Sequence, residues 1–245
     1  MSYYLQFLAN IGIGGAHPGG LPLTKAVLAA EPIKKSMHIL DLGCGTGQTA
    51  AFIAKYYGCQ VTALDIEKKM LEKAATRFAQ DRLDIRIVES SAENLPFKER
   101  LFDYVLAESV LAFTEVSKAL KQCFYVLKNG GQLIAIEMTK EKEDTLTDEE
   151  EQQIKSFYGV KEIMTEHEWY DKMKEAGFEK VQVLNVGDKY SKKGLEELSE
   201  LKLSQSFDFH ALRIWVEHQE LMAKLRHRLT YRVYKVRKTD PCLKN

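Results

Sequence analysis

From residue 36 onward, the chain alternates short apolar runs with longer stretches whose apolar residues recur at helical spacing. The longer stretches predict helices over residues 50–57, 70–78 and 116–127. The apolar runs predict strands over residues 38–40, 61–64, 85–88, 102–106, 133–136, 178–186 and 231–236. Strands that alternate with helices form right-handed βαβ units, because parallel neighbours need a crossover connection. The sequence therefore predicts an α/β fold with a doubly wound, seven-stranded and mostly parallel sheet. Its ligand should lie at the carboxyl ends of the strands.

The chain after the fifth predicted strand has a different pattern. Two segments each fit the capping box that opens a helix, Thr147–Glu150 and Thr165–Glu168. The sixth and seventh strands are separated by many more residues than a hairpin loop needs. Within that interval, stretches 195–203 and 207–225 have helical patterns. We therefore predict a helical insertion over residues 187–228 that caps the substrate.

The amino-terminal segment differs in composition from the rest. Residues 1–24 contain no Asp, Glu, Lys or Arg, although 29% of the whole chain is charged. Glycine and proline interrupt this stretch too often for a membrane-spanning helix. We expect it to pack on the protein, either as a loop over a ligand or as a strand or arm tied to the core, and the sequence leaves both open. As a loop, residues 3–20 would form a lid, with the glycine pairs 14–15 and 19–20 as hinges.

The charge balance bears on possible partners. Lys and Arg equal Asp and Glu at 35 each, so the formal net charge is +0. This balance argues against a dedicated nucleic-acid-binding protein. A basic segment near the carboxyl end has two interpretations, a surface that contacts RNA or an acidic substrate, and an edge strand. Its cations are Arg226, Arg228, Arg232, Lys235, Arg237 and Lys238.

Cysteine usage and apolar runs bear on the compartment. The four cysteines contain no C-x-x-C pair and share no short spacing with histidine, so we expect no metal site and a reduced, cytoplasmic setting. No uninterrupted apolar run reaches transmembrane length, and the first residues lack the positive flank of a signal peptide. We therefore expect no insertion into a membrane.

The most informative motif is Leu40–Gly47, which follows the first predicted strand and contains glycines at positions 43, 45 and 47. Glycines here let the backbone turn sharply and approach a ligand without a Cβ clash, and the next helix presents free N–H groups. A dinucleotide fingerprint would place its last glycine where this chain has Gln48. In addition, Asp41 precedes the first glycine by two residues. Both details argue against NAD and FAD.

This motif resembles motif I of the class I S-adenosylmethionine-dependent methyltransferases. Asp65 lies 22 residues after Gly43, at the end of the second predicted strand, where an acidic side chain accepts hydrogen bonds from ribose hydroxyls. The resemblance covers about residues 30–185, and the nearest branch is the small-molecule one, similar to the methyltransferases of ubiquinone and menaquinone biosynthesis. Other segments similar to that family's motifs are 90–97, 102–105, 127–131 and 175–178.

The resemblance implies a single methyltransferase domain over residues 1–245, with a Rossmann-like core over 30–185 that binds S-adenosylmethionine. Asp41 would bind the cofactor's ammonium group, and Asp65 would bind the ribose. Ser91 stands where the family usually has Asp, so one charge-assisted hydrogen bond becomes a weaker neutral one. The cofactor-binding residues that the resemblance implies are Asp41, Gly43, Cys44, Gly45, Gly47, Asp65, Ile66, Met70, Ser91, Ala92 and Glu108.

Methyl transfer from a sulfonium needs a base only when the acceptor carries a proton that must leave first. Three residues are candidates for that base: His17 in the uncharged segment, Glu108 after the fourth strand and Glu137 after the fifth. We expect a cytoplasmic methyltransferase acting on a small molecule, and the sequence does not determine its oligomeric state. Three alternatives stay open: an RNA or protein methyltransferase, a non-catalytic S-adenosylmethionine-binding module, and a related α/β enzyme that uses another nucleotide.

Overall fold

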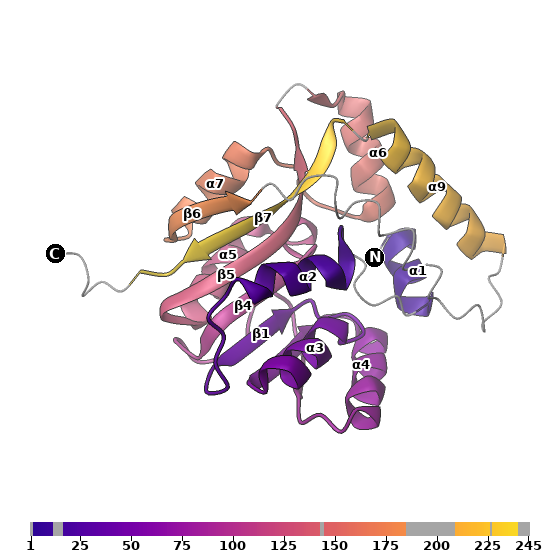
Figure 1. The fold of residues 1–245 in the computed structure, drawn as a ribbon. Coiled ribbons are helices and arrows are strands. Elements are labelled where there is room, and N and C mark those ends of the chain that lie inside the picture. The colour runs from indigo at the N-terminus through magenta and orange to yellow at the C-terminus, as the bar shows by residue number, and fades with distance from the viewer. Residues whose placement is uncertain (1, 12–16, 143–144, 185–208, 226, 240–245) are drawn as a thin grey trace.

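The computed structural model describes residues 2–11, 17–142, 145–184, 209–225 and 227–239. The strands in these residues form one sheet (Figure 1) and are β1 His38–Leu42, β2 Gln60–Asp65, β3 Arg86–Glu89, β4 Phe102–Glu108, β5 Leu127–Lys140, β6 Glu179–Leu184 and β7 Leu229–Arg237. Their order is β3-β2-β1-β4-β5-β7-β6. The pairs among β1 to β5 are parallel, and β7 runs antiparallel to its neighbours β5 and β6. The predicted doubly wound, mostly parallel sheet is confirmed.

Helices cover both faces of the sheet, because side chains alternate along each buried strand. In β4, Leu106 joins the core under the helices of one face, whereas Val105 and Ala107 join the core on the other face. The helices of the first face are α2 Gly20–Ala29, α3 Gln48–Tyr57 and α4 Lys68–Gln80. Those that pack into the core of the second face include α5 Val116–Val126 and α7 Glu166–Glu175.

Three helices from distant parts of the sequence gather at one end of the molecule (Figure 1). They are α1 Tyr3–Ile11, α6 Asp148–Tyr158 and α9 Phe209–Leu225. Phe7 and Leu8 of α1 form a small apolar cluster with Ile214 of α9, and Met70 of α4 and Phe157 of α6 pack against it. We call this group of helices the cap. It lies beyond the carboxyl ends of the parallel strands, where the fold places its ligand.

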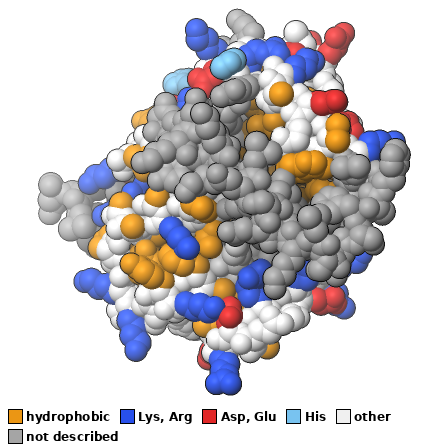
Figure 2. All heavy atoms as spheres, turned by 45° about the vertical axis from the view of Figure 1, so that its right-hand side comes forward, with side chains coloured by type: hydrophobic (Ala, Val, Ile, Leu, Met, Phe, Trp, Pro, Cys, Tyr) orange, Lys and Arg blue, Asp and Glu red, His pale blue; other side chains and the backbone are white. Residues whose placement is uncertain are grey.

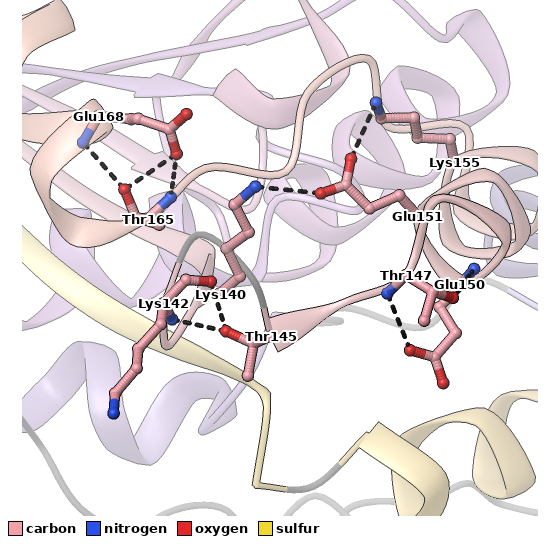
Figure 3. A network of polar contacts seen from close by, with 9 residues as sticks. All are labelled: Lys140, Lys142, Thr145, Thr147, Glu150, Glu151, Lys155, Thr165 and Glu168. Carbon is pink, nitrogen blue, oxygen red and sulfur yellow. Dashed lines mark hydrogen bonds and ion pairs between the residues drawn. The ribbon is translucent and has the colours of Figure 1, made fainter.

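Two capping boxes begin α6 and α7, as the sequence predicts (Figure 3). The Thr147 hydroxyl accepts a hydrogen bond from Glu150 N at 3.3 Å, and Thr147 N donates to Glu150 Oε2 at 3.2 Å. The Thr165 hydroxyl likewise accepts from Glu168 N at 3.2 Å. At the end of β5, the Lys140 ammonium group donates to Glu151 at 3.0 Å, which ties α6 to the sheet.

The expectation of a loop over residues 3–20 is wrong for much of that segment. Residues 3–11 form α1, and α2 begins at Gly20, where Gly19 occupies the N-cap position. The absence of charge has a packing reason, since Phe7 and Leu8 are buried in the cap and Leu23 is buried in the core under α2. The proposed hinge at residues 14–15 lies outside the described residues.

The carboxyl-terminal basic segment is an internal strand and not an edge strand. β7 lies between β5 and β6, so β6 forms this edge of the sheet. Three of its cations have acidic partners: Arg228 holds Glu150 through two hydrogen bonds, Arg232 contacts Glu141 at 2.9 Å, and Lys235 pairs with Glu31. Lys238 donates to the Phe124 and Leu127 carbonyls at the end of α5, and Arg226 lies outside the described residues. Carboxylates of the protein therefore already engage Arg228, Arg232 and Lys235.

Only part of the predicted insertion lies within the described residues. The helix expected over residues 207–225 is confirmed as α9, whereas the helix expected over 195–203 lies outside the described residues. None of the helices in the described part of the chain has the length and apolar character needed to cross a bilayer.

Candidate functional site

The turn between β1 and α3 follows the left-handed backbone that its glycines permit. Gly43, Gly45 and Gly47 have φ values of +69°, +51° and +73°. Cys44 N donates to Leu64 O at 2.9 Å, and Gly45 N donates to Asp65 Oδ2 at 2.8 Å. The turn is thereby fastened to the carboxyl end of β2, and it leads directly into the N-terminus of α3.

The three glycines of this turn are needed for different reasons. A Cβ at Gly43 would lie 2.3 Å from Val110 Cγ2, and a Cβ at Gly47 would lie 2.5 Å from Phe78 Cζ. A Cβ at Gly45 would meet nothing within 4 Å. Packing therefore requires glycine at the first and third positions, whereas Gly45 borders open space that a ligand can enter.

Carboxylates from adjacent strands converge on the turn. Asp41 on β1 is only 2% exposed, and its Oδ2 has no hydrogen-bond partner among the described residues. Burial raises the pKa of Asp41 well above its ordinary value, and the nearby charge of Glu108 raises it further. Burial also raises the pKa of Asp65, whose two oxygens accept hydrogen bonds from Gly45 N and from Glu67 N at 2.9 Å. These carboxylates favour a cationic or hydrogen-bond-donating ligand.

The remaining predicted cofactor residues lie around this turn with different exposures. Ile66, the residue after Asp65, is 66% exposed, which is unusual for a large apolar side chain. Ser91 and Ala92 follow β3, the neighbour of β2, and the Ser91 hydroxyl accepts a hydrogen bond from Glu93 N at 3.1 Å. Ala92 is buried in the core. Met70 lies further away and packs against the cap.

Cys44 has the environment of a packing residue. Its side chain is buried, and burial raises the pKa of its thiol well above the ordinary value. A thiol that stays protonated is a poor nucleophile. Within the described residues, no group of three or more His, Cys, Asp or Glu side chains is arranged to hold a metal ion.

Two of the three predicted bases, His17 and Glu108, meet in a buried polar cluster. His17 Nε2 lies 3.4 Å from Glu108 Oε2, and their side chains are only 3% and 8% exposed. Thr24 of α2 donates to Glu108 Oε1 at 2.5 Å, and Thr49 of α3 donates to Glu108 Oε2 at 2.8 Å. The carboxylate at the end of β4 is thus held from two helices and from the segment before α2.

Glu137, the third candidate, serves the backbone in this structure. Its fully buried carboxylate accepts hydrogen bonds from Val110 N at 3.0 Å, Leu111 N at 2.8 Å and Ala112 N at 3.3 Å. These donors begin the short 3-10 helix Leu111–Phe113. Burial raises the pKa of Glu137 to about 7, against the lowering effect of the three N–H groups. This geometry is that of a helix cap rather than of a base facing a substrate.

An aromatic cluster joins the three helices of the cap. Tyr4 of α1 stacks on His218 of α9 with ring centroids 5.2 Å apart, and Tyr158 of α6 contacts the Tyr4 ring edge-on at 4.9 Å. The Tyr158 hydroxyl and His218 Nδ1 form a hydrogen bond at 2.8 Å. Burial lowers the pKa of His218 to about 4, so its ring is neutral at physiological pH. Figure 2 shows that apolar side chains gather in patches on the face that carries α1 and α9.

Several of these residues were not identified from the sequence. Thr24 and Thr49 are ordinary helix residues in the one-dimensional pattern, and Val110 carries no motif of its own. Thr49 had one usable signal, since it lies two residues after Gly47 in the first turn of the helix that faces the ligand. His218 and Tyr158 are 60 residues apart, and no pattern in the sequence links them.

Comparisons with known proteins agree with this geometry. Residues 39–131 match a family described as a methyltransferase domain. The chain is 39% identical over 208 residues to the uncharacterized methyltransferase YodH of Bacillus subtilis (strain 168), covering 85% of this chain and 87% of that protein. It is also 39% identical over 111 residues to the ubiquinone/menaquinone biosynthesis C-methyltransferase UbiE of Zymomonas mobilis, which is 44% of this chain and 46% of that protein.

A solved structure extends the similarity to the whole fold. Phosphoethanolamine N-methyltransferase 2 of Haemonchus contortus, in complex with S-adenosyl-L-methionine, superposes with a TM-score of 0.81 at 20% identity. The alignment covers 96% of this chain and 56% of that protein. At this identity the likeness is one of fold.

The unequal environments of the glycines predict unequal effects of alanine. Gly47→Ala forces a Cβ into Phe78 at a left-handed backbone position, and we expect a loss of about 2–4 kcal/mol in the free energy of unfolding. Gly45→Ala has the same backbone strain but no clash, so we expect a loss of about 1 kcal/mol. Urea unfolding of both variants measures the difference. Equal losses would contradict the open space at Gly45.

The raised pKa of Glu137 predicts a pH dependence of stability. The folded protein holds this proton up to about pH 7, whereas an unfolded glutamate releases it near 4.5. The proton held by Glu137 therefore contributes about 3 kcal/mol to the free energy of unfolding below about pH 4.5. This contribution is lost as the pH rises through 7. Glu137→Gln stays neutral and should lack this loss, so we expect its stability relative to wild type to improve from pH 5 to pH 8.

Chemical unfolding at several pH values measures this dependence. Glu149→Gln, an exposed position in the first turn of α6, is the matched control and should keep the wild-type profile. Parallel profiles for wild type and Glu137→Gln would show that Glu137 does not hold the proton.

Proposed function

The chain belongs to the class I S-adenosylmethionine-dependent methyltransferases, and we propose that it transfers the methyl group to a small-molecule acceptor bound between the glycine turn and the cap. The observation that carries the proposal is the turn itself. Open space at Gly45 lies beside Asp41, which is buried with an unpartnered oxygen, and beside Asp65 at the next strand end. A buried carboxylate oxygen without a hydrogen-bond partner destabilises the fold unless a ligand donates a hydrogen bond to it.

The residues around the turn fit the cofactor. Asp41 would hold its ammonium group, since Oδ2 of this carboxylate has no hydrogen-bond donor among the described residues. Each carboxylate oxygen of Asp65 accepts one hydrogen bond from a backbone N–H. Each oxygen therefore keeps a second lone pair that can accept a hydrogen bond from a ribose hydroxyl. The exposed Ile66 would cover one face of the adenine. Ser91 and Ala92 would border its exocyclic amine from the end of β3, where the Ser91 hydroxyl supplies a neutral partner.

Other predicted contacts are weaker in this arrangement. Met70 packs against the cap and would approach the adenine only from that side. Gly43 and Gly47 would act through the shape of the turn, because Val110 and Phe78 occupy the space beside them. Cys44 would contribute packing and a fixed backbone N–H.

The chain's own groups favour a small acceptor. The cap presents aromatic rings of Tyr4, Phe157 and Trp215 in contact with one another or with His218, which suits a compact apolar or aromatic group. Arg228, Arg232 and Lys235 already pair with carboxylates of the protein, which leaves them less available to a nucleic acid. Two of the relatives are named for small molecules, a quinone precursor pathway and phosphoethanolamine.

The division of labour follows the position of these elements. Residues 30–185 would bind the cofactor, and the helices at 3–11, 148–158 and 209–225 would hold the acceptor. The segment 187–228 as a substrate cap stays a proposal of which α9 is the described part. Residues 1–24 supply α1 to the same cap, as an arm packed on α6 and α9.

Bound S-adenosylmethionine supplies a methyl group that is already activated on a sulfonium sulfur. The protein's task is then to orient the acceptor, exclude water and remove a proton where the acceptor carries one. Tyr158 and His218 join α6 to α9 by a partly buried hydrogen bond, which would help to keep water from this side. The buried Glu108–His17 cluster stands at the end of β4 as the group able to take the proton.

Cofactor binding is tested at Asp65. We expect Asp65→Ala to weaken binding of S-adenosylmethionine by about 2–4 kcal/mol, or roughly 30- to 1,000-fold, because two hydrogen bonds to a charged acceptor are lost. Isothermal titration calorimetry measures the affinity, and a thermal melt confirms that the variant is folded. Asp84→Ala, an exposed aspartate before β3, is the control and should bind like wild type. Unchanged affinity in Asp65→Ala would refute the ribose assignment.

The acceptor class is tested by the fate of the methyl group. We incubate the protein with tritium-labelled S-adenosylmethionine and cell extract, then separate small molecules, RNA and protein before counting. The proposal predicts label in the small-molecule fraction, and Asp65→Ala should abolish it. Label that appears only in RNA or protein would contradict a small acceptor.

A further inference from the structure

We propose that Glu108, Thr24 and His17 share one mobile proton and work as a single general base, with Glu108 as its catalytic end and Thr24 as its positioning residue. This inference rests on the proposed function for its role in methyl transfer. The shared proton itself is a property of the protein alone and can be measured without any ligand.

The three side chains form a continuous chain of hydrogen bonds. Thr24 Oγ1 lies 2.5 Å from Glu108 Oε1 and 3.2 Å from His17 Nε2. At the far end, His17 Nδ1 lies 3.2 Å from Pro18 O. All three side chains are buried, with Thr24 only 1% exposed. A hydrogen bond from Thr24 to Gly20 O, at 3.4 Å, is the longest of the set.

A count of protons shows what this chain can hold. The Pro18 carbonyl only accepts, so His17 Nδ1 carries a hydrogen. The Thr24 hydroxyl has one proton and stands between two groups that both accept in their basic forms, Glu108 and His17 Nε2. With every contact formed, one further proton must therefore reside on Glu108 or on His17.

Two arrangements satisfy that count. In one, Glu108 is ionised, Thr24 donates to it, and a protonated His17 Nε2 donates to Thr24. In the other, Glu108 is protonated and donates to Thr24, which donates to a neutral His17. The two differ by a shift of protons, either through the Thr24 hydroxyl or across the 3.4 Å contact between His17 Nε2 and Glu108 Oε2, so the carboxylate and the imidazole share that proton.

Glu108 is the end of the chain that faces the glycine turn. It is the last residue of β4, and Val110, two residues later, packs against Gly43. Thr49, in the first turn of α3, holds its other oxygen at 2.8 Å. The charged groups facing it from the neighbouring strands are Asp41 on β1 and, beyond it, Asp65 on β2. His17 is buried behind Thr24 and Glu108 and stores the proton.

The chemical step balances for an acceptor with an X–H group. Before the reaction, the hydrogen-bonded group lacks the shared proton, so Glu108 is ionised and His17 is neutral. The X–H proton passes to Glu108, moves on to the Thr24 oxygen, and the original Thr24 proton passes to His17 Nε2. The electron pair left on X forms the bond to the methyl carbon, and the pair of the broken methyl–sulfur bond stays on sulfur, which becomes a neutral thioether.

The test removes the Thr24 hydroxyl from the link and leaves only the longer 3.4 Å contact between His17 and Glu108. Thr24→Val is close in shape but has no hydroxyl, and Thr24→Ser restores the hydroxyl. Thr49→Val is the matched control, since it removes one hydrogen bond to Glu108 without interrupting the chain. Circular dichroism and thermal melts confirm the fold of each variant.

The first measurement uses the protein without ligand. Ring-nitrogen NMR of His17 and carboxyl-carbon NMR of Glu108 follow both groups over pH. In wild type, Thr24→Ser and Thr49→Val, we expect the two groups to titrate together, with hydrogen on Nδ1 throughout. In Thr24→Val, only the longer direct contact remains, so we expect the titration of both groups to move away from the wild-type curves. Identical titration of His17 in wild type and Thr24→Val would overturn the proposal.

The second measurement follows the rate of methyl transfer to the small-molecule fraction that the tritium-labelling experiment is expected to identify. We expect Thr24→Val to lower kcat about 100-fold and to alter its pH profile, while the KM for S-adenosylmethionine changes little and Thr24→Ser recovers most of the rate. A Thr24→Val enzyme with wild-type kcat and pH profile would overturn the role in catalysis. Wild-type protein that shows the shared proton but binds no S-adenosylmethionine in calorimetry would instead count against the proposed cofactor site.

Discussion

The hydrogen bond from Gly45 N to Asp65 Oδ2 is the interaction on which the rest of the site depends. It fastens a turn of left-handed glycines across the carboxyl ends of β1 and β2. Val110 after β4 and Phe78 of α4 pack against the same turn from two other sides. Because these contacts leave no room for a Cβ at Gly43 or Gly47, the strand ends and α4 hold one relative position, and only the space beside Gly45 stays open.

Around that turn the protein buries charge that its own groups do not fully compensate. Glu108 is satisfied by two threonine hydroxyls and by His17, whereas Asp41 Oδ2 has no hydrogen-bond partner among the described residues. Glu137 shows the contrasting case, since three backbone N–H groups donate hydrogen bonds to its carboxylate. Similar residues at neighbouring strand ends thus have different roles, and the difference lies in which donors the backbone brings to each.

The cap assembles chemistry from both ends of the chain. Tyr4 lies near the first residue and His218 near the last, yet their rings stack beside Tyr158 from the middle of the sequence. Their partnership follows from the antiparallel return of β7, which brings α9 back over the carboxyl ends of the parallel strands. Under the proposed function, the acceptor would therefore lie among helices from distant parts of the sequence, whereas the cofactor would lie against the regular core.

The sequence by itself determined the sheet, the glycine turn and the acidic residues at the strand ends, because these depend on local periodicity and on positions such as Gly43 and Asp65, where the backbone permits few residues. It also placed both capping boxes, which are encoded within four residues. Tertiary structure alone decided that the uncharged segment begins with a helix, that β7 is internal, and that Glu137 caps a 3-10 helix. It alone brought Thr24 and Glu108 together across 84 residues, because a hydrogen bond between distant side chains leaves no periodic trace in the chain.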